Sequence, residues 1–254
     1  EPILRKDGVC ALFFCMTEKD IEQLRAWADE YHRASFIVSD PVQFPHRYTQ
    51  AEDIEICGLL TALLSFGNRK QILKKVNELD ERMGQAPLKY LLSKEWEKDF
   101  PAGDGRSFYR MVSYGAFREY WEKLYEVYRH HTTLGDWLMR YPGIPMQRLC
   151  AFLGVSDRSP QKKLNMFLRW MVRRDSEVDF GIWRQMDPAE LIIPLDTHVC
   201  RMAWQLGLIE RPVFSLAAAK RITQVLSEIF PGDPCLGDFA LFGYGVNHPA
   251  LEEK

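Results

Sequence analysis

Helical periodicity is the feature of this sequence that most constrains its fold. Apolar residues recur at spacings of three and four along most of the chain, as in Ile21, Leu24, Trp27 and Tyr31. No run of alternating apolar and polar residues is long enough to build a sheet. The sequence therefore predicts an all-α fold, arranged as one compact unit or as two helical lobes.

Capping and breaking residues predict where the helices begin and end. Thr17, followed by acidic residues, is typical of a helix N-cap. Residues 40–49 contain two prolines and are expected to form an extended loop, and Pro142-Gly143 is expected to break the chain. Further helices are expected at 53–64, 69–83, 87–98, 106–131, 133–140, 145–153, 160–174, 188–192, 196–207, 215–230 and 236–243.

Composition excludes several classes of protein. Of the 254 residues 46% are hydrophobic and 27% are charged, which is globular composition and excludes a disordered or fibrous chain. A net charge of −2 argues against a polybasic protein but leaves room for a local basic face. The six cysteines form no C-x-x-C pair and no cluster with histidines at metal-ligand spacing, so we expect neither a metal site nor a cofactor.

The amino end is expected to lie outside the fold. Residues 9–16 are apolar, but the run is too short to span a bilayer, and no other segment approaches eighteen apolar residues. We expect a soluble, cytoplasmic protein with no membrane partner. Residues 1–15 are interpreted as an extension before a natural start at Met16, and residues 16–254 as one helical domain with two lobes and a cleft between them.

One segment is strongly basic. Residues 146–174 contain seven basic residues against one acid, Asp157, so their net charge is +6. Phosphate contacts require such clusters, and Arg158 is a candidate DNA-binding residue. A solvated helix face would explain a charge run equally well. The apolar character of residues 164–172 favours a functional reading, because lysines are seldom placed on a mostly buried helix without a purpose. Burial and a neighbouring cation would both lower the pKa of Lys162 or Lys163 toward that of a nucleophile.

A second constellation surrounds Asp196. Pro194 stops the preceding segment, and Asp196 then stands where a helix N-cap is expected, with Gly207 at the far end of that helix. Capping alone would account for Asp196, and His198 could equally be a surface residue.

The residues 195–199, Leu-Asp-Thr-His-Val, followed by Arg201 and Leu206-Gly207-Leu208, resemble the Asp-containing signature of the helix-hairpin-helix DNA glycosylase superfamily. That resemblance places a lysine nucleophile three residues before a helix asparagine, which carries over onto Lys162 before Asn165, with Lys163 as the alternative. Residues 165–173, 36–68 and 238–245 also resemble an uncharacterised bacterial family within this superfamily, so the likeness covers most of residues 17–247.

Two departures from the common pattern concern the hairpin and the spacing. After Gly154 the hairpin is longer than usual and lacks its second glycine, and Lys162 lies 34 positions before Asp196. Both features are similar to the archaeal 8-oxoguanine glycosylase branch, and the iron–sulfur cysteines of the endonuclease-III branch are absent. By this analogy we expect an oxidised purine, 8-oxoguanine, as the substrate.

The resemblance implies a bifunctional DNA glycosylase and AP lyase that flips a damaged base out of duplex DNA. Lys162 would be the nucleophile, Asp196 would stabilise positive charge on the sugar, and His198 would bind a phosphate. The remaining assignments place Phe66 as a wedge in the base stack, Asn68 on the opposite strand, and three residues in the base pocket: Met166, Asp238 and Phe242. Structural roles are the alternatives: Phe66 packed inward beside a helix C-cap at Gly67, which explains it about as well, Phe242 as a plain core residue, which is the commoner role, and Asp238 as a helix cap.

Two other functions fit the same residues. A non-catalytic helix-hairpin-helix DNA-binding protein would keep the scaffold without needing both Lys162 and Asp196. A monofunctional glycosylase would release the base with water as the nucleophile. In each reading the partner is double-stranded DNA, damaged in the enzymatic cases, and the protein is expected to be a monomer.

Overall fold

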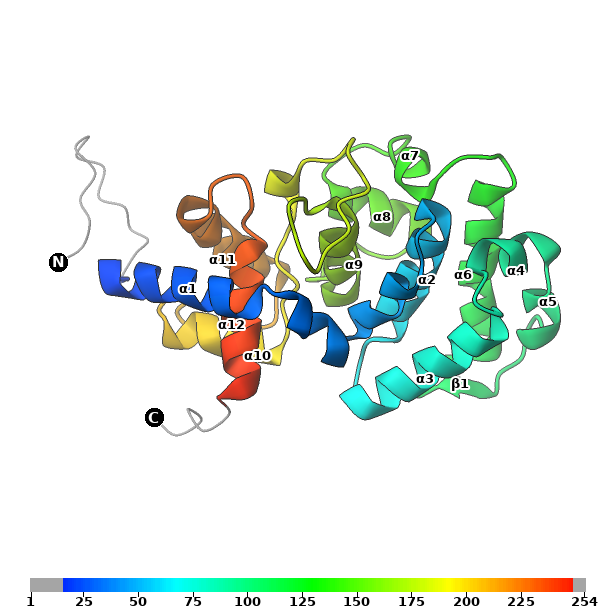
Figure 1. Ribbon diagram of the computed structural model, residues 1–254, viewed down its shortest axis with the longest axis horizontal. Helices are drawn as coiled ribbons and strands as arrows, with labels where there is room; N and C mark the ends of the chain where they lie inside the picture. The colour runs from blue at the N-terminus through cyan, green and yellow to red at the C-terminus, as the bar shows by residue number, and fades with distance from the viewer. Residues whose placement is uncertain (1–15, 249–254) are drawn as a thin grey trace. The chain divides into compact units, whose positions relative to one another are not determined.

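The computed structural model describes residues 16–248, which fall into two compact units. Unit 1 contains residues 16–36, 157–181 and 186–248, and unit 2 contains Ile37–Ser156 and Ile182–Gln185. Both units are mostly helical (Figure 1), so the predicted all-α class is confirmed. The interpretation of residues 1–15 concerns a segment outside the described residues. Within residues 16–248 no helix is both long and apolar enough to cross a membrane.

Unit 1 gathers the first helix of the chain with the helices of its last third. Its elements are α1 (Glu18–Tyr31), α9 (Lys162–Val172), the 3-10 turn η4 (Pro188–Glu190), α10 (Thr197–Gln205), α11 (Leu216–Ile229) and α12 (Leu236–Asn247). The predicted cap at Thr17 is confirmed: its hydroxyl accepts a hydrogen bond from the Asp20 amide, and the Asp20 carboxylate accepts one from the Thr17 amide. This reciprocal capping box fixes the start of α1.

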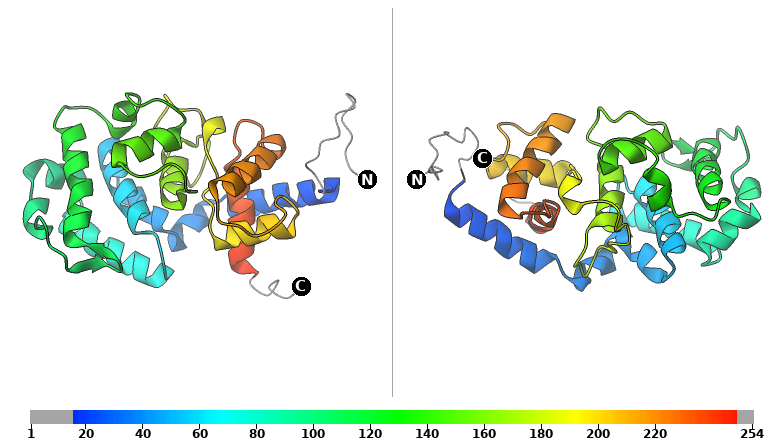
Figure 2. Two further views of the ribbon diagram at one scale, coloured as in Figure 1. Left: turned by 180° about the vertical axis from the view of Figure 1, so that it is seen from behind. Right: turned by 90° about the horizontal axis from the view of Figure 1, so that it is seen from above.

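Glycines on α12 let it approach two other helices closely. A Cβ atom at Gly243 would lie 2.3 Å from Cγ of Tyr31 on α1, and one at Gly245 would lie 2.9 Å from Cγ of Met202 on α10. The Trp27 and Tyr244 rings stack 3.9 Å apart beside the first contact, and α12 lies against α1 in both the front view and the view from above (Figures 1 and 2). The close approach brings the amino-terminal part of α12 to the residues of α9 and α10 considered below.

Unit 2 is formed by the middle of the chain. Its elements are η2 (Pro41–Gln43), η3 (Pro45–Arg47), α2 (Ala51–Leu64), α3 (Arg69–Arg82), α4 (Pro87–Ser93), α5 (Trp96–Asp99), β1 (Ser107–Tyr109), β2 (Val112–Ser113), α6 (Tyr114–Tyr128), α7 (Leu134–Leu138) and α8 (Pro145–Leu153). The 3-10 helix η1 (Ala34–Ser39) spans the boundary between the units.

The core of unit 2 is organised around α2, which is buried on nearly all sides. It carries one buried carboxylate, Glu55, which accepts hydrogen bonds from Tyr128 Oη and Trp183 Nε1, both at 2.5 Å, and from the amides of Leu134 and Gly135. Burial raises the pKa of Glu55, whereas the four donors act in the opposite direction. A carboxylate deep in a core is tolerated here because every oxygen has a partner.

Several predicted boundaries were wrong. The helix expected at 87–98 is split at Lys94, whose backbone is left-handed with φ +60°, into α4 and α5. The helix expected at 106–131 begins only at Tyr114, because Ser113 caps α6 by accepting from the Ala116 amide, and residues 107–113 form a short antiparallel hairpin. Residues 40–49 are mostly 3-10 turns instead of an extended loop, the segment 188–192 holds only η4, and α12 continues to Asn247.

Candidate active site

Helix α9 starts with the two candidate lysines. Lys162 and Lys163 are its first residues, and Gln161 before them has a left-handed backbone with φ +44°. A left-handed backbone costs a residue other than glycine on the order of 1 kcal/mol, so Gln161 holds strain at the point where the helix begins.

The two lysines have different surroundings. Both are half-buried. The Lys162 ammonium lies 3.6 Å from Sδ of Met166, one turn further along the same face. Burial and the neighbouring charge of Lys162 lower the pKa of Lys163. The expectation that burial and a second cation would act together on one lysine is therefore confirmed for Lys163.

Asp196 is the N-cap of α10, as the sequence predicts. One of its carboxylate oxygens, Oδ1, accepts a hydrogen bond of 2.9 Å from the Val199 amide. The residue is half-buried, and its backbone is extended with φ −119°. The cap therefore holds the Asp196 carboxylate in one orientation, and it uses only one of the two carboxylate oxygens.

His198 and Phe242 meet between α10 and α12. Their rings are perpendicular with centroids 6.1 Å apart, and Phe242 also meets the edge of the Phe36 ring at 6.1 Å. Nδ1 of His198 is buried and has no hydrogen-bond partner among residues 16–248. Phe242 is half-buried, so it is not a plain core residue.

Asp238 is the most unusual carboxylate in unit 1. It is the third residue of α12, only 4% exposed, and its Oδ2 accepts a hydrogen bond of 2.5 Å from Nη1 of Arg169. Its Oδ1 is buried and has no partner within the described part of the chain. Because α12 has Cys235 as its N-cap and Asp238 points to Arg169, the alternative that Asp238 caps the helix is wrong.

The charges of three candidate residues meet at Asp238. Burial raises the pKa of this carboxyl to about 6, the Arg169 guanidinium works against that rise, the Asp196 carboxylate adds to it, and the Lys162 ammonium lowers it. The charges of Lys162 and Asp196 thus both act on the Asp238 carboxyl, and these three residues of unit 1 are called the electrostatic cluster below.

A buried network of ion pairs is joined to this cluster through Asp238. Arg169 donates to Asp179 at 3.2 Å as well as to Asp238, and Arg173 donates to Asp179 at 3.0 Å and to Asp233 at 2.8 Å. Both guanidiniums lie over the Phe239 ring, 4.4 and 5.2 Å from its centroid. Three carboxylates thus face two guanidiniums, which leaves one negative charge without a matching arginine.

Because of this network, part of the positive charge of residues 146–174 is paired with buried acids. Arg169 and Arg173 are buried and paired with acids from 179, 233 and 238, so they do not supply a positive field for an anionic ligand. Arg148 donates to the Gly143 and Met139 carbonyls, which hold the guanidinium in place but, being neutral, do not cancel its charge. Arg158 is exposed, just before α9, and stays a candidate for phosphate contact.

Phe66 and Asn68 belong to unit 2. Asn68 is the N-cap of α3, accepting from the Gln71 amide at 3.3 Å. Phe66 is half-buried, its ring meets the edge of the Tyr109 ring at 5.1 Å, and its carbonyl accepts from Tyr109 Oη at 2.9 Å. Both residues therefore have structural duties in the turn between α2 and α3.

Sequence reasoning missed the ion network. Arg169 and Arg173 lie seven and eleven positions after Lys162, which places them on the same face of a helix. Arginines at that spacing in an otherwise apolar helix were a signal for buried acidic partners, because a buried charge requires pairing. The identity of the partners, 6 to 69 positions away, could not be found from spacing.

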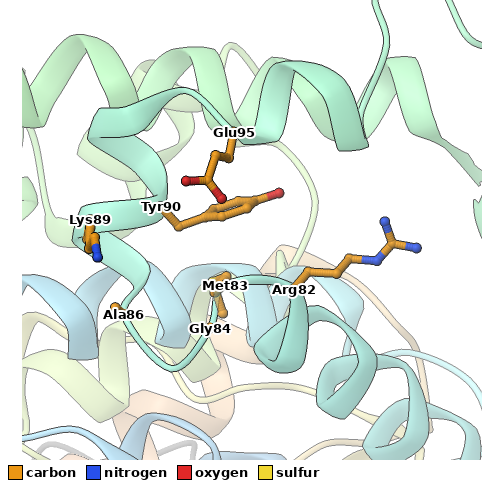
Figure 3. A pocket seen from close by; sticks show the side chains of 7 residues that line it. All are labelled: Arg82, Met83, Gly84, Ala86, Lys89, Tyr90 and Glu95. Carbon is orange, nitrogen blue, oxygen red and sulfur yellow. The ribbon is translucent and has the colours of Figure 1, made fainter.

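A pocket in unit 2 contains none of the predicted site residues. It has a volume of about 150 Å³ and is lined by residues of α3, α4 and the turns that follow each of them (Figure 3), namely Arg82, Met83, Gly84, Ala86, Lys89, Tyr90 and Glu95. Among residues 16–248 no three His, Cys, Asp or Glu side chains are grouped as metal ligands would be.

The geometry defines a mostly helical protein with a lysine and carboxylate cluster in one unit. The chain belongs to the family described as "Protein of unknown function (DUF2400)", which matches residues 40–149 and 144–247. No curated protein and no solved structure matches the chain. The relation to helix-hairpin-helix glycosylases therefore stays a proposal.

Proposed function

We propose that this protein is a DNA glycosylase with AP-lyase activity that removes an oxidised purine, 8-oxoguanine, from double-stranded DNA. The observation that carries the proposal is the electrostatic cluster of Lys162, Asp196 and Asp238. A purely structural protein has no need of a buried carboxylate that keeps one oxygen without a partner and responds to the charges of a half-buried lysine and a second carboxylate.

The chemistry assigned to the cluster is a substitution followed by an elimination. The neutral amine of Lys162 attacks C1′ of the flipped nucleotide, the glycosidic bond breaks, and its electron pair leaves with the base, which takes up a proton. Loss of a proton from nitrogen and opening of the sugar ring yield a Schiff base. Removal of a 2′ proton then expels the 3′ phosphate.

The carboxylates have separate duties in this scheme. Asp196, held by its cap to the Val199 amide, stabilises positive charge that develops on the sugar. Asp238, Met166 and Phe242 form the base pocket, with the partnerless Oδ1 of Asp238 as the acceptor for an N–H on the purine edge. His198 and Arg158 are assigned to the DNA backbone.

Borohydride reduction in the presence of a lesion-bearing duplex tests the proposal. We expect a covalent complex that is lost in Lys162→Gln and kept in Lys163→Gln. Retention in Lys162→Gln with loss in Lys163→Gln would move the nucleophile by one residue. No trapping with any lesion, together with salt-sensitive DNA binding, would favour the non-catalytic DNA-binding protein. Base release without trapping would favour the monofunctional enzyme.

A further inference from the structure

The β1–β2 hairpin of unit 2 presents an apolar side chain to solvent. Met111 is 85% exposed and lies in the two-residue tip between the paired residues Tyr109 and Val112. Arg110 beside it has a left-handed backbone with φ +54°, as tight hairpins require. The Met111 side chain leaves apolar surface in water, so packing does not explain why a methionine stands at this position.

The hairpin is anchored on the turn between α2 and α3. Tyr109 holds Phe66 through the ring contact and the hydrogen bond described above, and the Arg110 guanidinium lies 5.9 Å from the centroid of the Phe66 ring. The Lys75 ammonium of α3 lies 4.9 Å from the centroid of the buried Phe108 ring, and β1 runs beside α3 (Figure 1). Phe66 is thus committed to supporting the hairpin, whereas Met111 extends beyond it.

The hairpin and the helix beside it are rich in basic residues. The first half of α3, the hairpin and the residue before it contribute Arg69, Lys70, Lys74, Lys75, Arg106 and Arg110, and residues 66–77 include no acid. Lys75 pairs with Glu78 and Arg106 pairs with Asp104, both at 2.6 Å, but Lys70, Lys74 and Arg110 are exposed. Cations in the first turn of a helix oppose its dipole, so Arg69 and Lys70 do not serve the stability of α3.

We propose that the hairpin tip and the basic half of α3 form a duplex-DNA-binding surface. Met111 inserts into the base stack, and Lys70, Lys74 and Arg110 contact the flanking phosphates. An exposed apolar side chain on a basic hairpin and helix is the side-chain chemistry that unstacks a duplex step while holding its backbone. The inference rests on the proposed function for the kind of duplex, a damaged one, and it assigns to Met111 the insertion that the sequence assigned to Phe66.

Binding of the whole chain to a duplex with a tetrahydrofuran abasic analogue tests this surface, followed by fluorescence anisotropy. We expect Met111→Ala to bind on the order of tenfold more weakly. It should also abolish the fluorescence change of a 2-aminopurine placed next to the analogue. Lys70→Ala with Lys74→Ala should lower the slope of log Kd against log salt by about two. These residues are exposed, so the variants are expected to fold.

Matched controls use the same residue types elsewhere in unit 2. Met139→Ala removes another exposed methionine, and Lys89→Ala with Lys98→Ala removes two exposed lysines. Neither control should change Kd or the salt slope. Wild-type affinity in Met111→Ala and in the double lysine variant would overturn the inference, as would tight binding of single-stranded RNA with none of duplex DNA.

The outcome separates this inference from the proposed enzyme. If the wild type cannot be trapped with borohydride but binds duplex DNA through Met111 and Lys70, the surface stands and the glycosylase fails. If trapping succeeds and the variants bind like the wild type, the glycosylase stands and the surface fails.

Discussion

Asp238→Asn provides the sharpest test of the buried charge cluster. The substitution keeps the shape of the side chain but removes its titration. In the folded protein burial raises the pKa of Asp238 to about 6 from an ordinary value of 3.8. The folded state therefore binds a proton more tightly than the unfolded chain, so this group stabilises the fold below pH 4, and that stabilisation is lost as the pH rises to about 6.

The magnitude follows from the two pKa values. Between pH 4.5 and pH 7.5 ionisation of Asp238 lowers the free energy of unfolding by about 2 kcal/mol. Asn cannot titrate, so the variant should lack this loss. The variant also loses the charge-assisted hydrogen bond to Arg169, which lowers the free energy of unfolding at pH 7.5. Removal of the excess negative charge raises it, so the two effects oppose each other. The difference between the two pH profiles is therefore a better measure than either stability alone.

Urea unfolding followed by tryptophan fluorescence at pH 4.5, 6.0 and 7.5 measures this difference. The free energy of unfolding of the wild type should fall over this range by about 2 kcal/mol more than that of Asp238→Asn. Phe242→Leu, one turn away on α12, is the control, since it alters packing without altering titration and should keep the wild-type profile shape. Parallel profiles for the wild type and Asp238→Asn would refute the reasoning.

Two further predictions concern packing. Glu55→Gln should lower the free energy of unfolding by about 3 kcal/mol, because an amide NH₂ would face N–H or O–H donors that now bind a carboxylate; an unchanged urea midpoint would contradict this. Gly243→Ala should destabilise by about 2 kcal/mol, since its Cβ would lie 2.3 Å from Cγ of Tyr31. The control Gly105→Ala, where a Cβ meets nothing within 4 Å, should be nearly neutral in the same thermal unfolding assay.

Sequence reasoning succeeded where the determinants are local. The cap at Asp196 follows from a proline, an acid and an apolar helix in succession, and the structure confirms it. The break at Lys94 was missed because no glycine or proline marks it. The hairpin was missed because strands of three and two residues are too short to show alternation. The ion pair between Arg169 and Asp238 joins residues 69 positions apart, so only the tertiary fold creates it.

The choice of nucleophile between Lys162 and Lys163 now rests on two observations that point to different residues. Burial beside another cation lowers the pKa of Lys163, which increases its neutral, nucleophilic fraction. The charge of Lys162 is the one that acts on Asp238, on which the charge of Asp196 also acts. A nucleophile must reach the sugar while a carboxylate stabilises the developing charge. We therefore give the position of the amine priority over its pKa. Proton transfer can correct an unfavourable protonation state, whereas it cannot move an amine toward its substrate. Under the proposed function Lys162 therefore fits the attack on the sugar, and Lys163, its half-buried neighbour with the lowered pKa, stays the alternative nucleophile.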